Sequence, residues 1–339
     1  MSAAQTKVSL ILETVNLELA DLAGLRHCLD SISKQSLDLT DCEILMVESG
    51  EVPEEALRDL QGEYPWLNLH QVPPGMGYEE AKMTGVEVTS GEIVAFFDAD
   101  CIYEKDWLRN LINDGLLTRP DLGVLGGETM IDTGSVWGIT SSLLFSFNFY
   151  STASDIYNYE RFHFNNVAFR REVLQQHPIP TRQPLFRTST MLYSMELREA
   201  GIEVGRQPRS RALHAAPNGW RHFFWRYLMF GHDAAGVLKL ARKRAFAKQA
   251  TLSEGGRPLN RLWHLARNRL RTISRRASFL LREQPRRWLY LPVVLPLVGT
   301  GLLLMTAGYL MRGLSSELLP AIMPSEIKRG SSFADRSAT

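Results

Sequence analysis

Apolar residues in the first hundred positions fall into short continuous runs separated by amphipathic stretches. The runs predict buried strands at Val8–Leu12, Glu43–Val47, Leu67–Val72 and Ile93–Phe97. The stretches between them predict helices at Leu25–Ile32, Pro53–Leu60 and Glu79–Val88. Strands that alternate with helices in this way favour an α/β fold with a mostly parallel central sheet flanked by helices.

The pattern becomes less regular after residue 100. It predicts a helix over Lys105–Leu116, a strand over Leu122–Gly127 and an apolar, aromatic region over Trp137–Tyr150. A strand within Phe162–Arg171 leads into a helix, and a second helix over Thr190–Ala200 is ended by Gly201. Two short strands are expected at Ile202–Val204 and Arg211–His214.

Long helices and one uncharged run are predicted for the last third of the chain. The helices cover Trp220–Leu240 and Arg261–Leu281, and the run Leu289–Met311 has no charged residue. At 1.5 Å per residue such a run reaches about 35 Å, which is enough to cross a bilayer with some tilt. We therefore expect a membrane segment over 288–312, with a single crossing favoured over a re-entrant hairpin.

The charge of the chain is strongly asymmetric although its net charge is only +1. Residues 239–287 carry fifteen Lys and Arg against two acids, Glu254 and Glu283, which leaves the rest of the chain near −12. A basic arm beside an apolar span favours binding to an anionic membrane surface from the cytoplasmic side. Nucleic acid is the other anionic partner that such an arm could meet, but no recognised nucleic-acid module accompanies it.

Cysteine content and the N-terminus restrict the compartment. The three cysteines are scattered and odd in number, so neither a disulfide framework nor a zinc site is expected, and a reducing environment fits them. The N-terminal residues pass directly into the first predicted strand, so we expect no cleavable secretory signal. The basic arm beside the apolar span is expected to place the domain that precedes it on the cytoplasmic side.

Two carboxylates stand where the strand Ile93–Phe97 ends. Asp98 and Asp100 are separated by one residue, so both side chains point to the same side of an extended chain. In an open α/β sheet, ligands bind beyond the carboxyl ends of the strands. Paired carboxylates there suit Mg²⁺ or Mn²⁺ held together with a phosphate. The alternative is an ordinary strand-to-helix turn in which an Asp caps the helix.

A series of motifs over Val8–Asp233 resembles the family 2 glycosyltransferases, which are inverting enzymes of the GT-A fold. The motifs are Ser9–Asn16, Leu29–Gln35, Glu48, Gly75–Gly91, Asp98–Asp100, Asn165–Arg171, and His214 with Pro217. The resemblance implies transfer of a sugar from a nucleotide-sugar donor to an acceptor hydroxyl with Mn²⁺ or Mg²⁺. The cation would neutralise the charge that develops on the leaving diphosphate.

The same resemblance assigns roles to individual residues. It implies a donor-binding set of Thr14, Glu48, Lys82 and Asp98. It implies a metal-binding set of Asp98, Asp100 and His214. It implies an acceptor-side set of Asn165, Asn166 and Arg170.

Three positions depart from the family: Met83 stands where the family usually has Asn, Glu48-Ser49 stands where it usually has an acid pair, and the general base is missing. The family supplies it from an acidic pair about a dozen residues before the glycine that ends the helix, and the positions counted back from Gly201 are Ser189 and Thr190. Neither accepts a proton as a base would. Glu196 and Glu160 are the candidate replacements, with Asp155 as a further one. The alternative for the helix carboxylates is a solvated surface.

These observations predict a membrane-anchored glycosyltransferase that acts on a lipid-linked or envelope polysaccharide acceptor. The runner-up is a catalytically silent GT-A protein that binds a nucleotide sugar as a membrane scaffold. The expected organisation is a GT-A domain over 1–235, a basic helical arm over 236–287, a membrane segment over 288–312 and a flexible tail over 313–339.

Overall fold

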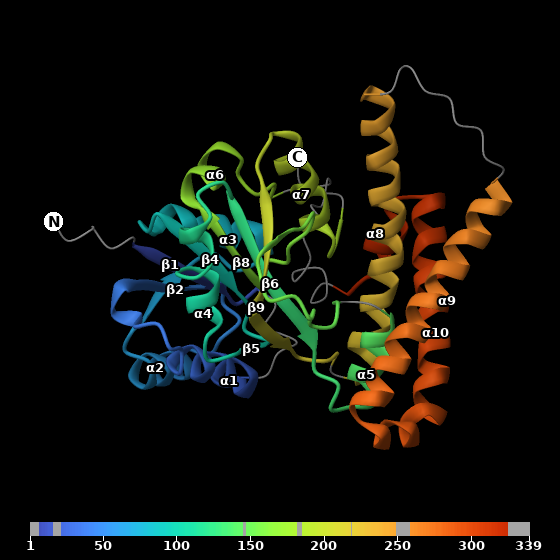
Figure 1. Ribbon diagram of the computed structural model, residues 1–339, viewed down its shortest axis with the longest axis horizontal. Coiled ribbons are helices and arrows are strands. Elements are labelled where there is room, and N and C mark those ends of the chain that lie inside the picture. The colour runs from blue at the N-terminus through green and yellow to red at the C-terminus, as the bar shows by residue number, and fades with distance from the viewer. Residues whose placement is uncertain are drawn as a thin grey trace. The chain divides into compact units, whose positions relative to one another are not determined.

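The computed structural model describes residues 7–15, 22–144, 147–181, 185–217, 219–248 and 258–324 (Figure 1). Asn16, the part of the basic arm at 249–257 and the predicted tail beyond residue 324 lie outside these residues. The chain forms two compact units. The first takes in described residues of Met1–Met130, Phe149–Ala215 and Met323–Thr339, and the second takes in those of Ile131–Asn148 and Ala216–Ile322.

A mixed sheet forms the frame of the first unit, with strand order β3-β2-β1-β4-β8-β6-β9-β5. Its first four strands are parallel and match the predicted runs: β1 (Val8–Glu13), β2 (Cys42–Glu48), β3 (Leu67–Gln71) and β4 (Ile93–Phe97). The connecting helices are α1 (Leu22–Ser33), α2 (Glu54–Glu63) and α3 (Tyr78–Val88). The predicted α/β class is confirmed.

The second half of the sheet is built from antiparallel pairs. Its strands are β5 (Cys101–Tyr103), β6 (Val124–Ile131), β7 (Tyr157–Asn158), β8 (Asn166–Arg170) and β9 (Val204–His214). Strand β4 pairs with β8, and β9 pairs with both β5 and β7. The fold is therefore parallel around β1 and antiparallel toward β9 and β5.

The two short strands expected between Ile202 and His214 are one strand, so that prediction was wrong. The polar residues at 205–210 favoured a loop between two strands. In the structure most of them are buried within β9. The guanidinium of Arg206 donates to Gly127 O and Arg161 O, and Gln207 donates to Asn110 O. Buried polar groups are tolerated when they are hydrogen-bonded, and these bonds let the strand continue.

The helix expected over Lys105–Leu116 is also shorter than predicted. Helix α4 covers Trp107–Leu111, and a 3₁₀ turn follows at Leu116–Thr118. The intervening residues are Asn113, Asp114 and Gly115, which favour turns over helix. Asn and Asp side chains can hydrogen-bond to nearby backbone, and glycine adopts turn conformations without steric cost.

Side chains of β4 alternate between the two apolar cores of the first unit. Ile93, Ala95 and Phe97 pack with the residues of α1, α2 and α4, whereas Val94 and Phe96 pack with those of α3, α6 (Arg171–Gln176) and α7 (Ser189–Glu199). All five residues of β4 are buried. Helices thus cover both faces of the central strand, and only its carboxyl end opens toward other groups.

The second unit is helical. It contains α5 (Val136–Leu144), α8 (Gly219–Lys248), α9 (Pro258–Glu283), α10 (Leu291–Leu314) and α11 (Leu318–Ile322). Glycines allow α8 and α10 to pack at very short range. A Cβ at Gly231 would overlap the carbonyl of Met305, and one at Gly308 would overlap that of Leu228, so neither position accepts a side chain without moving backbone.

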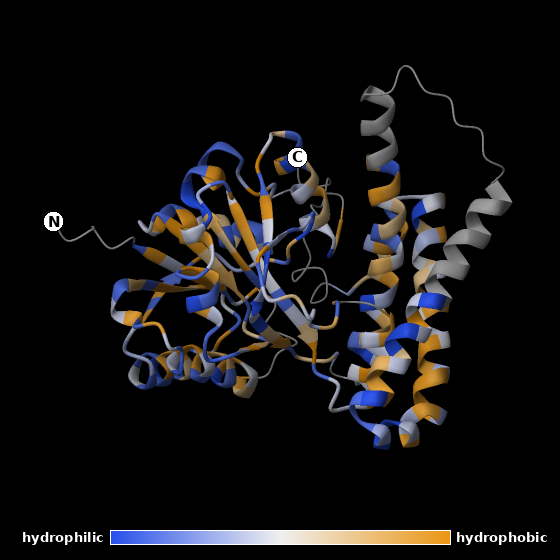
Figure 2. Cartoon of the chain, in the orientation of Figure 1, coloured by the Kyte–Doolittle hydropathy of each residue, from blue (hydrophilic) through white to orange (hydrophobic). Residues whose placement is uncertain are grey.

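One described helix, Pro285–Leu314, is long and apolar enough to cross a membrane, and only 17% of its most apolar stretch is buried. Figure 2 shows the apolar residues that follow one another along α10. Not every arginine of the predicted arm points outward. Arg276 is buried and donates to Ser142 O at 2.7 Å, and Arg287 donates to Thr133 Oγ1. Part of the positive charge in this region therefore holds the helical unit together.

Candidate functional site

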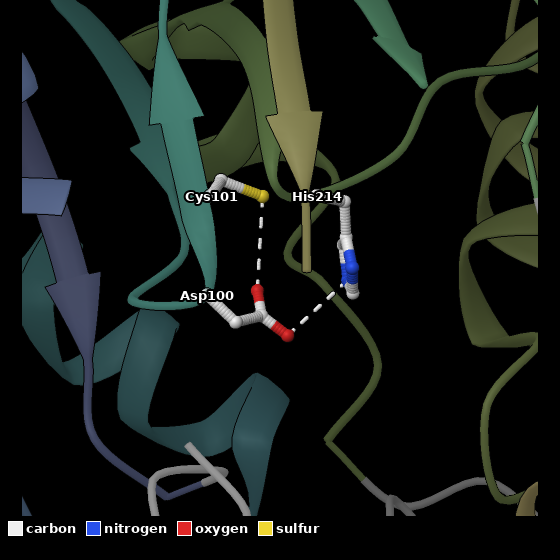
Figure 3. Close-up of side chains that lie close together, drawn as sticks. All are labelled: Asp100, Cys101 and His214. Carbon is white, nitrogen blue, oxygen red and sulfur yellow. Dashed lines mark hydrogen bonds and ion pairs between the residues drawn. The ribbon is translucent and has the colours of Figure 1, made fainter. Parts of the chain in front are cut away.

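The end of β4 and the pairing of β5 with β9 bring an acid and a histidine together. Asp100 immediately precedes β5, and the antiparallel register sets Cys101 opposite His214. This register places His214 Nε2 3.2 Å from Asp100 Oδ2 (Figure 3). The Cys101 thiol donates to the other oxygen of Asp100 at 3.7 Å. The two members of the predicted metal set that meet here are therefore Asp100 and His214.

The hydrogen bonding of His214 suits a cation ligand. Its Nδ1 lies 2.6 Å from Ala215 O, and a carbonyl only accepts, so Nδ1 carries the proton. If the ring is neutral, Nε2 presents a lone pair toward the Asp100 carboxylate. The lone pairs of Nε2 and Asp100 Oδ2 repel each other at 3.2 Å unless a proton or a cation lies between them. Backbone contacts that fix the tautomer in this way are common in metal-binding histidines.

The donor atoms available at this point fit a divalent cation. One atom each from Asp100, Cys101 and His214 lie within 4.8 Å of one another. Carboxylate and imidazole ligands suit Mn²⁺, and Mg²⁺ would rely on the carboxylate. Asp98 is not part of this group, so its predicted part in metal binding stays a prediction.

The turn that presents both acids is held by three hydrogen bonds. The Tyr103 hydroxyl accepts from Asp98 N at 2.9 Å and donates to Asn165 O at 2.7 Å. The Cys28 thiol donates to Asp98 O at 3.3 Å. These contacts fix the backbone between β4 and β5, so Asp100 meets His214 without a rearrangement of the loop.

The Asp98 carboxylate is tied to α3. Lys82 Nζ donates to its Oδ1 at 2.8 Å, and the Tyr78 hydroxyl lies 3.1 Å from both oxygens. Lys82 is fully buried, 4.6 Å from the centre of the Tyr78 ring and 4.0 Å from Glu13 Oε1. The predicted donor residues Lys82 and Asp98 are thus brought together, with the ammonium placed between two carboxylates.

Burial shapes the protonation of the groups around Lys82. It raises the pKa of Tyr78 well above its usual range, and the nearby Asp98 charge adds to this, so Tyr78 stays a hydrogen-bond donor. Burial also raises the pKa of Glu13 to about 8, although Lys82 opposes the shift. At neutral pH Glu13 is therefore mostly neutral, and the main ion pair is Lys82 with Asp98.

The raised pKa of Glu13 leads to a pH-dependent prediction. The unfolded chain loses this proton near pH 4.5 and the folded chain near pH 8. The stabilisation from this group is therefore complete below about pH 4.5 and is lost as the pH rises to about 8. We expect Glu13→Gln to be increasingly stabilised relative to wild type between pH 5 and pH 8. Urea midpoints at both pH values test this, and an unchanged difference between the two proteins would contradict it.

Two other predicted donor residues have local partners at the end of β2. The Glu48 carboxylate is buried and accepts from Glu51 N at 2.7 Å and Val52 N at 3.0 Å. Thr14 Oγ1 accepts from Ser49 N at 3.2 Å. Both side chains therefore fix the turn after β2 in the described residues, and their contact with a donor stays a prediction.

The predicted acceptor-side residues are also held by the protein. The side chain of Asn165 accepts from Thr129 Oγ1. Asn166 accepts from Trp107 Nε1 at 2.8 Å and donates to two backbone carbonyls. Arg170 donates to the carbonyls of Leu122 and Leu116. Their backbone places β8 beside β4, whereas contact with an acceptor stays a prediction.

The candidate bases are not brought to the Asp100 and His214 pair by any described contact. Glu160 pairs with Arg198 at 3.2 Å, and the neighbouring Tyr159 N donates to Val204 O at the start of β9. His214 ends that strand, about 30 Å further along an extended chain. Glu196 lies near the carboxyl end of α7, where Ala200 N donates to its carbonyl. Asp155 accepts from Ser154 Oγ.

Several residues of the site were not predicted as such. Glu13 and Tyr78 surround Lys82, and Cys101 joins the metal group. A signal for two of them exists in the sequence. Continuing the parallel register of β1 and β4 sets Glu13 beside Asp98, and Tyr78 lies one helical turn before Lys82. No comparable signal exists for Cys101. It lies opposite His214 because β5 pairs with β9, a strand that is distant in the sequence.

Comparison with known proteins assigns the domain. Residues 16–177 match the model of the family described as glycosyl transferase family 2. This part of the chain belongs to that family. The family 2 match covers β4, the paired acids and β8, while His214 lies beyond it.

Relatives and a solved structure agree with the family 2 assignment. The chain is 28% identical over 130 residues to the glycosyltransferase AglE of Haloferax volcanii, covering 38% of this chain and 41% of AglE. It is 25% identical over 126 residues to a glucosyl-dolichyl phosphate glucuronosyltransferase of the same organism, covering 37% of this chain and 39% of the relative. The chain thus spans about two fifths of the length of these relatives.

The fold also matches a solved mannosyltransferase from Pyrobaculum calidifontis, PcManGT, determined with GDP-Man and Mn²⁺. The TM-score is 0.53 at 16% identity, covering 91% of this chain and 88% of the other. The predicted GT-A fold is confirmed by this likeness together with the family match.

Proposed function

We propose that this chain transfers a sugar from a nucleotide-sugar donor to an acceptor hydroxyl, with inversion at the sugar carbon. The observation that carries the proposal is the pair formed by Asp100 and His214 at the carboxyl end of the central strand of a family 2 domain. A bound Mn²⁺ or Mg²⁺ would supply charge neutralisation to the leaving diphosphate. Asp100 and His214 would hold that cation, and Lys82 would hold Asp98 in place.

The preformed geometry supports this role. The turn between β4 and β5 is fixed by Tyr103 and Cys28, so the ligand atoms are positioned before a donor arrives. Groups that need no reorganisation stabilise developing charge best. No feature of the described residues, and none of the comparisons, favours the catalytically silent scaffold over the enzyme.

The acceptor is proposed to be lipid-linked or an envelope polysaccharide. One relative is a glucosyl-dolichyl phosphate glucuronosyltransferase, whose name describes a lipid-linked substrate. This relative supports a lipid-linked acceptor for the present chain. The apolar helix Pro285–Leu314 is suited to a bilayer, and the basic residues before it suit an anionic lipid surface on the cytoplasmic side. The chain would then meet its acceptor at the membrane surface.

A donor-binding screen tests the function. The full chain in detergent is titrated with UDP-glucose, UDP-N-acetylglucosamine, GDP-mannose and dTDP-glucose, with and without Mn²⁺, and release of nucleoside diphosphate is followed. We expect at least one donor to bind in a metal-dependent way and to be turned over slowly with water. Absence of binding for every donor would contradict the proposal.

The membrane anchor leads to a separate prediction. Deleting α10 would also expose the face of α8 that packs on Gly308, so substitutions on the exposed face of α10 are the sharper test. Leu295, Leu303 and Leu310 are each more than half exposed. Changing all three to asparagine removes apolar area worth about 1.5–3 kcal/mol per side chain in a bilayer.

We expect the wild-type chain to stay in the membrane fraction in high salt. The triple variant should be released there, because salt screens the remaining electrostatic attraction. Sedimentation of membranes at low and high salt measures this. Equal retention of both proteins in high salt would place the anchor elsewhere.

A further inference from the structure

Helices α8 and α10 of the helical unit run side by side in the same direction (Figure 1). A Cβ added at Gly301 of α10 would lie 3.3 Å from the Phe223 ring of α8. Further along α8, the ring of His232 lies 3.2 Å from the carbonyl oxygen of Ser316, just after α10. The contacts advance along both helices together, so the two helices are parallel.

The parallel packing determines what a bilayer crossing would require. Because α8 and α10 point the same way, the chain that links them has to return along the same length. That link contains α9, in which seven of the 26 residues are arginines. If α10 crossed a bilayer with α8 beside it, these arginines would have to pass through the hydrocarbon core, where charged side chains are costly. The buried His232 and Asp233 of α8 would enter the same region.

Helix α10 is also tied to α9 through α5. The buried Arg276 of α9 donates to Ser142 O of α5, and Leu144 of α5 packs against Gly301 of α10. At the other end of the link, Arg287 donates to Thr133 Oγ1, just before α5. A crossing by α10 alone would therefore break its contacts with both α8 and α5.

One side of α10 is packed within the unit, and the opposite side is exposed along the whole helix. The packed side contains Val294, Val298, Gly301 and Gly308. The large apolar side chains on the exposed side are Val293, Leu295, Leu303, Leu310 and Leu314, and α11 adds Leu318 and Ile322. The 24 residues of α10 reach about 36 Å, so this apolar face is as long as a bilayer is thick.

Basic and aromatic side chains border the amino end of this apolar face. Arg282 and Arg286 are exposed, and Trp288 and Tyr290 follow them with exposed rings. Tryptophan and tyrosine favour the boundary between headgroups and acyl chains. Arginines beside them are attracted to anionic headgroups. The charge and the apolar surface thus complement the headgroups and the acyl chains of an anionic leaflet.

We propose that the helical unit lies flat in one leaflet of an anionic bilayer, with the exposed face of α10 against the acyl chains, and that α10 does not cross. The length of the apolar run by itself favours a single crossing, but the parallel α8 and the arginines of α9 oppose it. Helices that lie in the interface are buried about 5–10 Å into the boundary between headgroups and acyl chains. This inference rests on the proposed membrane attachment and is independent of the sugar transfer.

The side of the membrane on which Ser316 lies tests the inference. Ser316 follows α10, whereas Ser274 lies on α9 before it, and both are exposed. S316C and S274C are made in the full chain, and inverted vesicles with the cytoplasmic face outward are prepared from bacterial cells that express them. We expect a membrane-impermeant maleimide to label both variants to within twofold, above the wild-type background. Labelling of S316C only after detergent is added would show a crossing and overturn the inference, while the membrane attachment would stand.

The depth of α10 in the bilayer gives a second readout. Nitroxide labels are attached at L295C, L303C and L310C in the full chain, bound to vesicles of phosphatidylcholine and phosphatidylglycerol. Accessibility to a lipid-soluble and a water-soluble relaxant measures the depth of each label. We expect equal depths to within about 5 Å, because a flat helix keeps its exposed face at one level. A crossing would place the label at 303 about 10 Å deeper than the other two, and that pattern would overturn the inference.

Charge variants test the chemistry of the leaflet. The double variant R282Q, R286Q should bind vesicles that contain phosphatidylglycerol about 25-fold more weakly than wild type, since each basic residue near an anionic surface contributes about fivefold. R282K, R286K keeps both charges and should bind like wild type. Equal binding of the glutamine variant and wild type would overturn the anionic leaflet as the partner. Failure of wild type to bind any vesicle would overturn the membrane attachment and this inference with it, whereas the donor screen tests the sugar transfer separately.

Discussion

Replacing Asp100 with alanine is expected to lower the Mn²⁺-dependent affinity for a nucleoside diphosphate by about 100-fold or more. Loss of groups that merely orient a ligand already costs 10- to 100-fold in metal affinity, and Asp100 is proposed as a direct ligand. The fold should survive, because the Asp100 side chain is 29% exposed at the end of a strand and not part of the apolar core. Affinity without metal should change little.

Calorimetric titration with and without Mn²⁺ measures both quantities. Asp106→Ala is the matched control, since Asp106 is exposed, lies on the same stretch and makes no capping bond with its side chain. His214→Ala should reduce the metal-dependent part in the same direction. Equal Mn²⁺ dependence in wild type and in the Asp100 variant would remove the basis for a cation at this pair.

Replacing Lys82 with methionine is expected to destabilise the first unit by about 3–5 kcal/mol. The substitution conserves much of the side-chain volume but leaves the Asp98 carboxylate beside Tyr78 without its cation. Removal of one partner of a buried ion pair costs this much because the other charge remains desolvated. Glu13 should then stay neutral to a higher pH, since the Lys82 charge is the larger of the two effects that lower its pKa, the other being the hydrogen bond from Val15 N.

The double variant Lys82→Met, Asp98→Asn separates the charge effect from packing. It removes both charges, so we expect it to be more stable than Lys82→Met alone. Lys105→Met is the control, because Lys105 is an exposed lysine near the same loop. Urea midpoints of the detergent-solubilised chains give the comparison. A Lys82 variant as stable as the Lys105 control would show that the ion pair contributes nothing.

The local pattern of the sequence was sufficient for the parallel half of the sheet. Apolar runs bounded by turns gave the four strands β1 to β4, and Asp98 and Asp100 followed from the end of the last one. Such signals depend on neighbouring residues only. The family resemblance then added the GT-A fold, which the comparisons confirm.

The antiparallel half of the sheet was harder to predict from the sequence, because polar residues of its strand β9 are buried. Arg206 and Gln207 are polar by composition, but in β9 they satisfy carbonyls of distant segments. No local pattern distinguishes such a strand from a loop. The helical unit presents the same difficulty, because Ile131–Asn148 joins it from the middle of the chain.

Contacts between remote segments were the other limit. Asp100 and His214 were both predicted as metal ligands, but the register that sets Cys101 against His214 comes from tertiary structure. The contact between Glu79 and Ser189 likewise joins α3 to α7. Counting positions from Gly201 showed where the family's acid is missing, and the identity of the base stays a prediction.

The pairing of β5 with β9 has a consequence for synthesis of the chain. Asp100 and His214 are separated by more than a hundred positions, so a ribosome adding 5–20 residues per second needs on the order of ten seconds between them. During that interval the emerging chain holds the acid without the imidazole. The proposed cation site is therefore completed only when β9 docks, and we expect a nascent chain stalled before His214 to be unable to retain a metal ion there.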